Sequence, residues 1–396
     1  MIQKKRLTLS VIKADVGSGG GHTRPSPKMV QAVESVLGKA ITDKVIIDGH
    51  TCFTGDDLAL IMSHTRGEGA EVIHLNVALE AFYRATDVAK YQGQHGAGQD
   101  LLKDATSGNL RGCGPGVAEI SFDHDPGKHN KVRPSEQVLV FAADKCGPGA
   151  YNLPLFLTCA DPMYNSGLLQ NAAIQQGFTF EIIDMDHTEG DRLIVLQTPE
   201  DYYRIATLLR DELRFAIRRI SSRAFPELTV AAVSADRLHN ISGKYSGKDD
   251  PVAVVRAQGN LPATEEWMMP WIIGHEVAGG ARGGHVMPLM PVAINTAVTG
   301  FYCLPVVSCL AFSVAPDGRF SDHVVDMFSN PAWDYVRFNA QRTAIQGRRQ
   351  GFFGPRVMLP TSELEYGGIA DVLAGLEGRF EVRIPTDAPA EVLAEE

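Results

Sequence analysis

Short apolar segments of β type recur along this chain and alternate with segments of helical periodicity. Because strands and helices are interleaved, the pattern predicts an α/β or α+β fold, and two β-rich stretches with few helices between them favour more than one sheet. A chain of 396 residues is long enough to bury a large core. The expected strands are 6–14, 44–53, 58–65, 117–122, 137–144, 178–186, 228–235, 251–256 and 305–314. The expected helices are 26–38, 72–91, 199–219, 331–348 and 368–377, where apolar residues return every three or four positions.

Composition argues against several classes of function. Hydrophobic residues make up 44% of the chain, but no apolar run reaches the length of a membrane span, and residues 1–10 lack the apolar centre of a signal peptide. We therefore expect a cytoplasmic protein with no membrane partner. The formal net charge of -10 argues against a nucleic-acid partner, whose phosphates require a basic face. The six cysteines show no C-x-x-C pair and no regular spacing, so we expect reduced thiols.

Aspartates stand at the ends of several expected strands and in the loops beside them. One such acid is compatible with a solvated turn, but paired carboxylates beside an apolar strand are unfavourable unless water or cations reach them. A carboxylate set without cysteine favours Mg²⁺ over zinc, and two or more such ions suit phosphoryl transfer to water. The six aspartates are Asp15, Asp56, Asp57, Asp144, Asp249 and Asp250.

The glycine run DVGSGGGH follows the first expected strand and leaves three interpretations open. A nucleotide phosphate loop is one, although the run lacks G-K-[ST] and the last glycine of G-x-G-x-x-G. A plain turn with a surface histidine is the second. In the third, flexible glycines let Asp15 and His22 reach the same ion. Further along, Gln99 and Asp100 stand at a possible helix start, where Asp100 can act as a cap.

The stretch GKYSGKDDP, residues 243–251, crowds a tyrosine, lysines and two aspartates between glycines and a proline. The two carboxylates favour a protonated Lys248, which is not a nucleophile. If divalent ions offset the charge of Asp249 and Asp250, Lys248 can lose its proton and form a Schiff base with a carbonyl substrate. Tyr245, three residues earlier, is close enough to move protons. A glycine-rich surface turn with solvated charges is the alternative.

Several long motifs occur in a fixed order: SVIKADVGSGGGH, GDDLALIMSHTRG, AGQDLL, SGNLRGCGPGVAE, ADKCGPGAYNLPL, GKYSGKDDPV and PLMPV. In this order they resemble the bifunctional fructose-1,6-bisphosphate aldolase/phosphatase family of archaea and some bacteria. The resemblance covers nearly the whole chain, as far as ELEYGGI near its end. It implies a single catalytic domain over 1–396 with a four-layer α-β-β-α fold, assembled as a homo-octamer.

The resemblance also implies an activity and a set of site residues. Such an enzyme condenses dihydroxyacetone phosphate with glyceraldehyde 3-phosphate and then hydrolyses the C1 phosphate of the product, which makes sugar phosphates the partners and several Mg²⁺ ions the cofactor. Lys248 would form the Schiff base and Tyr245 would donate and accept protons. The implied metal ligands are Asp15, His22, Asp56, Asp57, Gln99, Asp144, Asp249 and Asp250. The implied substrate contacts are His22, Gly108, Asn109, Lys145, Gln258, Arg282 and Tyr366, and His95 stands at a further contact position.

The chain departs from the family pattern at positions that touch substrate recognition. His95 stands where the family commonly has a tyrosine, and Phe301 and Cys303 stand where an arginine and an acidic residue are common. The chemistry is therefore expected to persist better than the exact substrate. Two alternatives stay open: a phosphatase that acts on a sugar bisphosphate without condensing trioses, and a non-catalytic acidic protein in which divalent ions hold an oligomer together.

Overall fold

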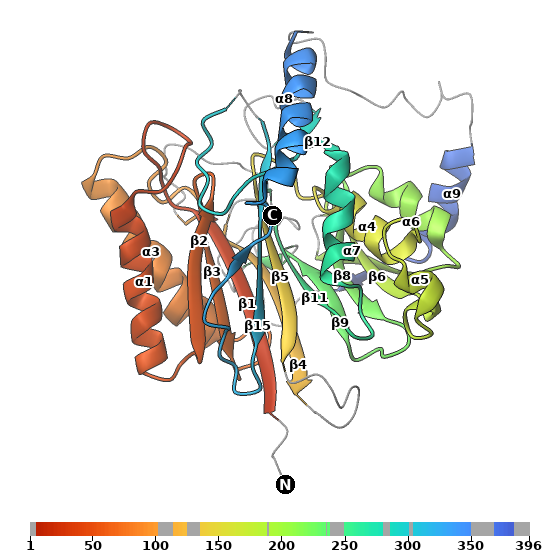
Figure 1. Cartoon of the computed structure of the whole chain (residues 1–396), viewed down its shortest axis with the longest axis horizontal. Helices are drawn as coiled ribbons and strands as arrows, with labels where there is room; N and C mark the ends of the chain where they lie inside the picture. Colours follow the sequence, from red (N-terminus) through yellow and green to blue (C-terminus); the bar gives the residue numbers. More distant parts are fainter. Residues whose placement is uncertain are drawn as a thin grey trace, which may run out of the picture.

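The computed structural model describes residues 5–101, 114–124, 135–187, 190–234, 236–237, 249–279, 286–300, 304–349 and 368–383. Over these residues the chain forms two β-sheets that lie face to face, with helices on both outer sides (Figure 1). No described helix combines the length and the apolar character that a membrane crossing requires. The described cysteines, Cys52, Cys146, Cys159 and Cys309, are buried free thiols, as expected.

The first sheet is antiparallel and, within the described residues, has the strand order β10-β4-β1-β3-β2. Its outer face is covered by α1 (Pro27–Thr42) and α3 (Glu80–Tyr91). Helix α1 begins where Ser26 accepts a hydrogen bond from the Met29 N–H and Pro27 occupies the first helical position, a favourable start in both respects. The strands are β1 (Lys5–Asp15), β2 (Asp48–Thr54), β3 (Asp57–His64), β4 (Gly116–His124) and β10 (Asp236–Arg237).

The second sheet has the order β14-β15-β5-β11-β9-β8-β6-β7-β17, and β16 pairs with β15. Its strands are β5 (Glu136–Asp144), β6 (Phe178–Asp184), β7 (Asp191–Gln197), β8 (Phe215–Ser222), β9 (Thr229–Val233), β11 (Val252–Ala257), β14 (Met290–Pro291), β15 (Val306–Val314), β16 (Val325–Asp326) and β17 (Glu381–Arg383). The helices on its side are α4 (Asn152–Ala160), α5 (Gly167–Gln170), α6 (Tyr202–Leu209), α7 (Thr264–Met268), α8 (Asp334–Arg348) and α9 (Gly368–Glu377). A separate pair joins β12 (Glu276–Ala278) to β13 (Val286–Pro288), and short helical turns make up the rest: α2 (Glu71–Ile73), η1 (His74–Leu79), η2 (Ile174–Gln176), η3 (Met269–Ile273) and η4 (Pro331–Trp333).

Alternation along the strands separates the interior into layers. In β1, Ile12 and Ala14 pack under α1 and α3, whereas Leu9 and Val11 face the second sheet. Successive side chains of a strand point to opposite faces, so one apolar strand can serve two cores. Strand β5 does the same on the other side of the molecule. The fold is therefore the α-β-β-α sandwich that the resemblance implied.

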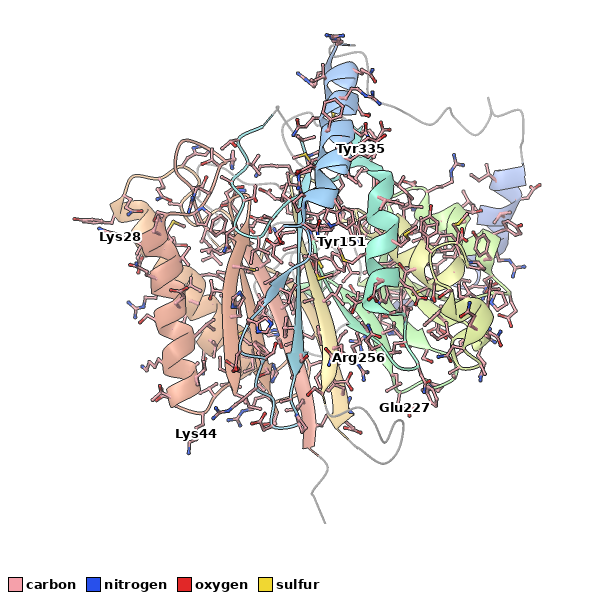
Figure 2. All side chains as sticks on the ribbon, in the orientation of Figure 1. Lys28, Lys44, Tyr151, Glu227, Arg256 and Tyr335 are labelled. Carbon is pink, nitrogen blue, oxygen red and sulfur yellow. The ribbon has the colours of Figure 1, made fainter. Side chains whose placement is uncertain are left out.

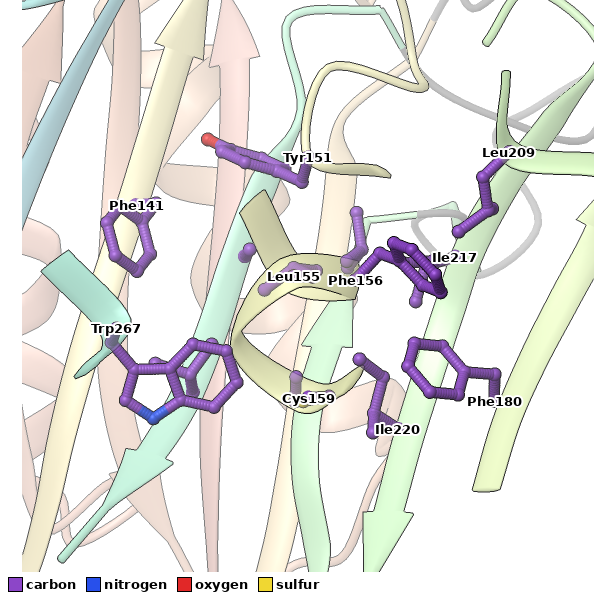
Figure 3. Packing of buried hydrophobic residues seen from close by; sticks show 14 of the residues in the cluster. Phe141, Tyr151, Leu155, Phe156, Cys159, Phe180, Leu209, Ile217, Ile220 and Trp267 are labelled. Atoms are coloured by element: carbon purple, nitrogen blue, oxygen red, sulfur yellow. The ribbon is translucent and has the colours of Figure 1, made fainter. Parts of the chain in front are cut away.

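The outer core of the second sheet surrounds α4, which is apolar on almost every side. Figure 3 shows Leu155 and Phe156 of this helix among residues from β5, β6 and β8. Phe141 stacks on Trp271 with ring centroids 5.0 Å apart. The Tyr151 hydroxyl donates to the carbonyl of Pro251 at 2.9 Å and ties the loop after β5 to the start of β11. This packing gives the loop after β5 a rigid base.

Several expected elements differ from the structure. The helix expected at 199–219 is wrong in its second half, because α6 ends at Leu209 and Phe215 begins β8, which pairs with β6. The strand expected from 44 begins only at Asp48. Helix α4 and strand β7 were not expected; α4 is so uniformly apolar that it shows no helical period. The remaining expected helices are present, the one at 72–91 with a π-helical turn at His74–Leu79.

Candidate metal centre

The predicted acidic residues meet at one edge of the space between the two sheets. Strand β1 ends at Asp15 directly opposite Asp57, the first residue of β3, because the two strands are antiparallel. Strand β5 ends at Asp144, and its antiparallel neighbour β11 begins just after Asp250. Asp15, Asp57 and Asp144 share the strand face of the apolar residues packed between the sheets, and Asp250 has a ligand atom within 4.8 Å of those of Asp57 and Asp144.

Two groups of side chains at this edge have ligand atoms within 4.8 Å of one another. The first, which we call the histidine cluster, consists of Asp15, His22 and Asp56. The second, the carboxylate cluster, consists of Asp57, Asp144 and Asp250. Lys145 joins the two, since its Nζ lies 2.5 Å from Asp56 Oδ1 and 2.8 Å from Asp144 Oδ1.

The histidine cluster is built by the glycine run after β1. His22 Nδ1 lies 3.0 Å from Asp56 Oδ2 and 3.8 Å from Asp15 Oδ2. Hydrogen bonds to Asp15 and then to Asp56 raise the pKa of His22 to about 9. Burial, and next the charge of Asp56, raises the pKa of Asp15 to about 7. Burial acts on Asp56 in the same direction, but the bond from His22 and the charge of Lys145 outweigh it and lower the pKa of Asp56.

The carboxylate cluster is more deeply enclosed. Burial raises the pKa of Asp144 well above its usual value, despite the ammonium of Lys145. Burial, followed by the charge of Asp249, raises the pKa of Asp250 to about 8. Asp250 is held by two hydrogen bonds to the backbone of Cys146: its N–H donates to the Cys146 carbonyl at 2.8 Å, and its side-chain Oδ1 accepts from the Cys146 N–H at 2.9 Å.

Backbone strain is concentrated at the same place. Asp250 and Lys145 have φ values of 51° and 64°, a region that residues with a Cβ rarely occupy. Gly55, at φ 62°, passes so close to Asp144 that a Cβ built on it would lie 1.6 Å from Asp144 Oδ2. Such conformations persist where the surrounding structure over-determines them, often at ligand sites. Tight packing thus fixes the Asp144 carboxylate in one place.

The charges and the donor atoms of the two clusters suit hard divalent cations. Six aspartates, Asp249 included, contribute six formal negative charges, against three positive charges from Lys13, Lys145 and protonated His22. Burial is the main cause of the raised pKa values, and the neighbouring carboxylates add to it; bound cations would offset this excess of negative charge. Carboxylate oxygens with one imidazole are ligands of this class of ion.

Gln99 adds a further candidate ligand. Its Oε1 is buried and has no hydrogen-bond partner among the described residues, which is unusual for a buried amide oxygen. The turn that carries Gln99 is tied to the end of β1, because Asp100 Oδ2 accepts from the Asp15 N–H at 2.9 Å and Gly98 donates to the Val16 carbonyl at 3.0 Å. Residues 96–101 thus form a turn that supports the histidine cluster, while the residues after Leu101, where the possible helix would begin, lie outside the described chain.

Comparison with known proteins agrees with this geometry. The family model described as fructose-1,6-bisphosphatase matches residues 6–381. The chain belongs to the fructose-1,6-bisphosphatase family. A relative from Thermus thermophilus, named fructose-1,6-bisphosphate aldolase/phosphatase, is 50% identical over 375 residues, which cover 95% of this chain and 99% of that protein.

Archaeal relatives carry the same name. The protein from Thermococcus kodakarensis is 44% identical over 382 residues, covering 95% of this chain and 98% of its own length. The protein from Cenarchaeum symbiosum is 43% identical over 361 residues and 91% of each chain. The similarity therefore extends over nearly all of both proteins, including the residues that form the two clusters.

The predicted site residues outside the two clusters of this fructose-1,6-bisphosphatase family member lie beside the clusters, away from them, or outside the described chain. His95 packs edge-on against His22, with ring centroids 4.8 Å apart, and its backbone exchanges hydrogen bonds with Ser18. Gln258 follows the last residue of β11, at the opposite end from Asp250, so the described chain does not bring it to either cluster. Asp249 is half-buried beside the carboxylate cluster. Lys248, Tyr245, Gly108, Asn109, Arg282 and Tyr366, and the departures Phe301 and Cys303, lie outside the described residues.

Sequence reasoning missed two residues at this site. Lys13 is buried and pairs with Asp57, and Gly55 shapes the position of Asp144. A signal for Lys13 was present, because it is a charged residue in an otherwise apolar β segment and shares the parity of Asp15. No local signal existed for Gly55, whose neighbour Asp144 is distant in sequence.

Proposed function

We propose that this chain is an Mg²⁺-dependent fructose-1,6-bisphosphate aldolase/phosphatase. The observation that supports this most is the pair of clusters that share Lys145 at the edge of the two sheets, in a chain related over nearly its whole length to proteins of that name. Asp15, His22, Asp56 and Gln99 would hold cations on one side, and Asp57, Asp144, Asp249 and Asp250 on the other. The bound ions would polarise a phosphoryl group and activate water for its hydrolysis.

The chain's own residues have distinct tasks in the phosphatase step. Lys145, held between Asp56 and Asp144, presents an ammonium where a phosphate would lie. With Asp56 and Asp144 holding cations, the Lys145 ammonium would be able to donate to phosphoryl oxygens. His22 donates from its ring and, with His95 packed against it, lines the same side of the site. Both histidines and Lys145 are therefore proposed substrate contacts, together with Gly108, Asn109, Arg282 and Tyr366; Gln258, at the far end of β11 from the clusters, is not among them.

The aldolase step is proposed for Lys248 and Tyr245. Asp250 is fixed against the Cys146 backbone, and Lys248 precedes it by two residues, which span at most about 7 Å of chain. The chain is therefore short enough that Lys248 cannot be far from the carboxylate cluster. Lys248 would attack the carbonyl of dihydroxyacetone phosphate, and Tyr245 would move protons as the new carbon–carbon bond forms with glyceraldehyde 3-phosphate.

The wider context of the activity belongs to the same proposal. We propose one catalytic domain over 1–396, assembled as a homo-octamer in the cytoplasm and acting in gluconeogenesis on small sugar phosphates. The second candidate is a sugar-bisphosphate phosphatase without aldolase activity. One observation favours it: hydrolysis at the two clusters needs no Schiff base, and His95, which packs against His22, stands where a tyrosine is common at the substrate.

Borohydride trapping separates the two candidates. The protein is incubated with Mg²⁺ and dihydroxyacetone phosphate, reduced, digested and mapped by mass spectrometry, with Lys248→Ala as the control. We expect an adduct on Lys248 in the unmutated protein and phosphate release when both triose phosphates are supplied. No adduct, with fructose 1,6-bisphosphate still hydrolysed, would leave the phosphatase alone. No phosphate release from any of these substrates with Mg²⁺ present would refute both candidates.

A further inference from the structure

Lys13 is a buried cation directly beneath the carboxylate cluster. Its side chain is 2% exposed and its ammonium pairs with Asp57 Oδ2. Strand pairing places Lys13 in one row with Ala59 and Cys52, and both of these neighbours face the space between the sheets. Lys13 therefore points into the same space as the acids, one layer further inside the molecule.

The charge of Lys13 acts on the whole carboxylate cluster. Asp57 joins the two, since it pairs with Lys13 and also has a ligand atom within 4.8 Å of Asp144 and Asp250. The charge of Lys13 is also among those that act on Asp250 and on the buried thiols of Cys52 and Cys146. A charge felt over this range in a buried site is only weakly screened by solvent.

A buried lysine next to a cation site has two opposing effects. It holds one oxygen of Asp57 and keeps that carboxylate compensated when no cation is bound. It also repels a divalent ion and competes with it for Asp57. The net result is a site that is stable without its ion and binds the ion less tightly than its carboxylates alone would allow.

We propose that Lys13 is a resident cation of this site, a positioning residue that holds Asp57 and limits the affinity of the carboxylate cluster for a divalent ion. This inference rests on the proposed metal dependence. It assigns a role to a residue outside the proposed set of metal and substrate ligands.

The chain contains a matched control at the opposite end of the same interior. Arg256 of β11 is 3% exposed, pairs with Glu136 at 3.1 Å and lies over the ring of Phe122. Strand β11 starts just after Asp250 and ends one residue after Arg256, so Arg256, which Figure 2 labels, lies at the opposite end of the strand from the carboxylate cluster. Removing either cation takes the ion pair from a buried carboxylate, but of the two only Lys13 borders the proposed ion.

The test compares thermal unfolding of Lys13→Met, Arg256→Met and the unmutated protein across a Mg²⁺ titration. Both variants are expected to melt at lower temperature than the unmutated protein when the metal has been removed. For Lys13→Met, the Mg²⁺ concentration that gives half of the maximal stabilisation should fall by about tenfold or more. The repulsion between a unit charge and a divalent ion a few ångströms away is larger than the free energy that corresponds to a tenfold change in affinity. For Arg256→Met, that concentration should stay within about twofold. The charge of Arg256 is too far from the proposed ion to change the Mg²⁺ affinity by a factor of ten. Lys13→Gln, which can still donate to Asp57 without a charge, should shift in the same direction and serves if Lys13→Met does not fold.

The outcomes are distinct. An unchanged or weakened Mg²⁺ response in both Lys13 variants would refute the inference and leave an ordinary structural ion pair. No Mg²⁺ stabilisation of the unmutated protein would instead count against the proposed metal dependence itself. Isothermal titration of the metal-free proteins with Mg²⁺ provides a second readout that does not depend on activity.

Discussion

Gly55→Ala tests directly whether the position of Asp144 controls the site. The substitution adds a single methyl group on the loop between β2 and β3, at φ 62°. Its Cβ would lie 1.6 Å from Asp144 Oδ2 and 2.8 Å from Val298, whereas ordinary contact begins at 3.4 Å. The Asp144 carboxylate would have to move by roughly 2 Å. A misplacement of only about 1 Å can already lower rates by about 100-fold.

The expected loss has two separable parts. A Cβ in the left-handed region alone destabilises by about 1–2 kcal/mol. Displacement of Asp144 adds the loss of its bonds to Lys145 at 2.8 Å and to the Asp56 N–H at 3.2 Å, together about 2–4 kcal/mol. Gly93→Ala isolates the first part, because Gly93 has φ 63° and no atom within 4 Å of an added Cβ.

The assay combines urea unfolding with Mg²⁺-dependent phosphate release from fructose 1,6-bisphosphate. Gly93→Ala should lose only the conformational part of stability and keep its activity within about twofold, since nothing near the site moves. Gly55→Ala should lose more stability and at least about 100-fold in kcat/KM, with a higher Mg²⁺ requirement. If the two variants behave alike in Mg²⁺ dependence and in rate, Asp144 does not act as the geometry indicates.

Three further predictions concern other parts of the structure. Burial lowers the pKa of His64 to about 4 from an ordinary 6.5. Its contribution to stability is therefore present above pH 6.5 and is lost as the pH falls to 4, by about 3 kcal/mol at most. His64→Gln should flatten the dependence of the free energy of unfolding in urea on pH over this range, and an unchanged slope would contradict the prediction. Asp56→Asn should lower the pKa of His22, about 9 in the metal-free protein, in an NMR titration, and reduce phosphate release by about 100-fold or more; an unshifted His22 would exclude the pairing. Trp271→Ala, at a buried ring stacked on Phe141, should cost about 3–5 kcal/mol in urea unfolding while the Mg²⁺ midpoint of the folded protein stays the same; a shifted midpoint would mean that this core and the site are coupled.

Much of the site was predictable because the ends of strands can be recognised from the local alternation of apolar residues. Asp15 and Asp144 are the last residues of β1 and β5, as the apolar alternation before each of them predicted. The glycine run after Asp15 folds back and brings His22 next to Asp15, as the third interpretation requires, and the shared ion stays a prediction. In each case the relevant residues are neighbours in sequence or follow from a period of two.

Local pattern failed where tertiary packing overrides it. Residues 210–219 look helical by spacing, yet Phe215 and Ile217 pair in β8 with Asp184 and Ile182 of β6. A segment of mixed period takes the structure that its neighbours complete. Helix α4 shows the reverse problem: a helix buried on nearly every side has no polar face to reveal its period.

The amino-acid sequence alone determined which residue types the site contains and that they lie at strand ends, because backbone alternation and chain continuity are local properties. Only the tertiary structure decided which acids share a cluster. Asp56 and Asp144 are 88 positions apart, Lys145 and Gly55 acquire their roles only when the two sheets pack face to face, and Lys13 meets Asp57 only when β1 and β3 pair. The physical reason is that electrostatic and steric interactions act through space, so the charge balance of a buried site is set by packing rather than by spacing along the chain.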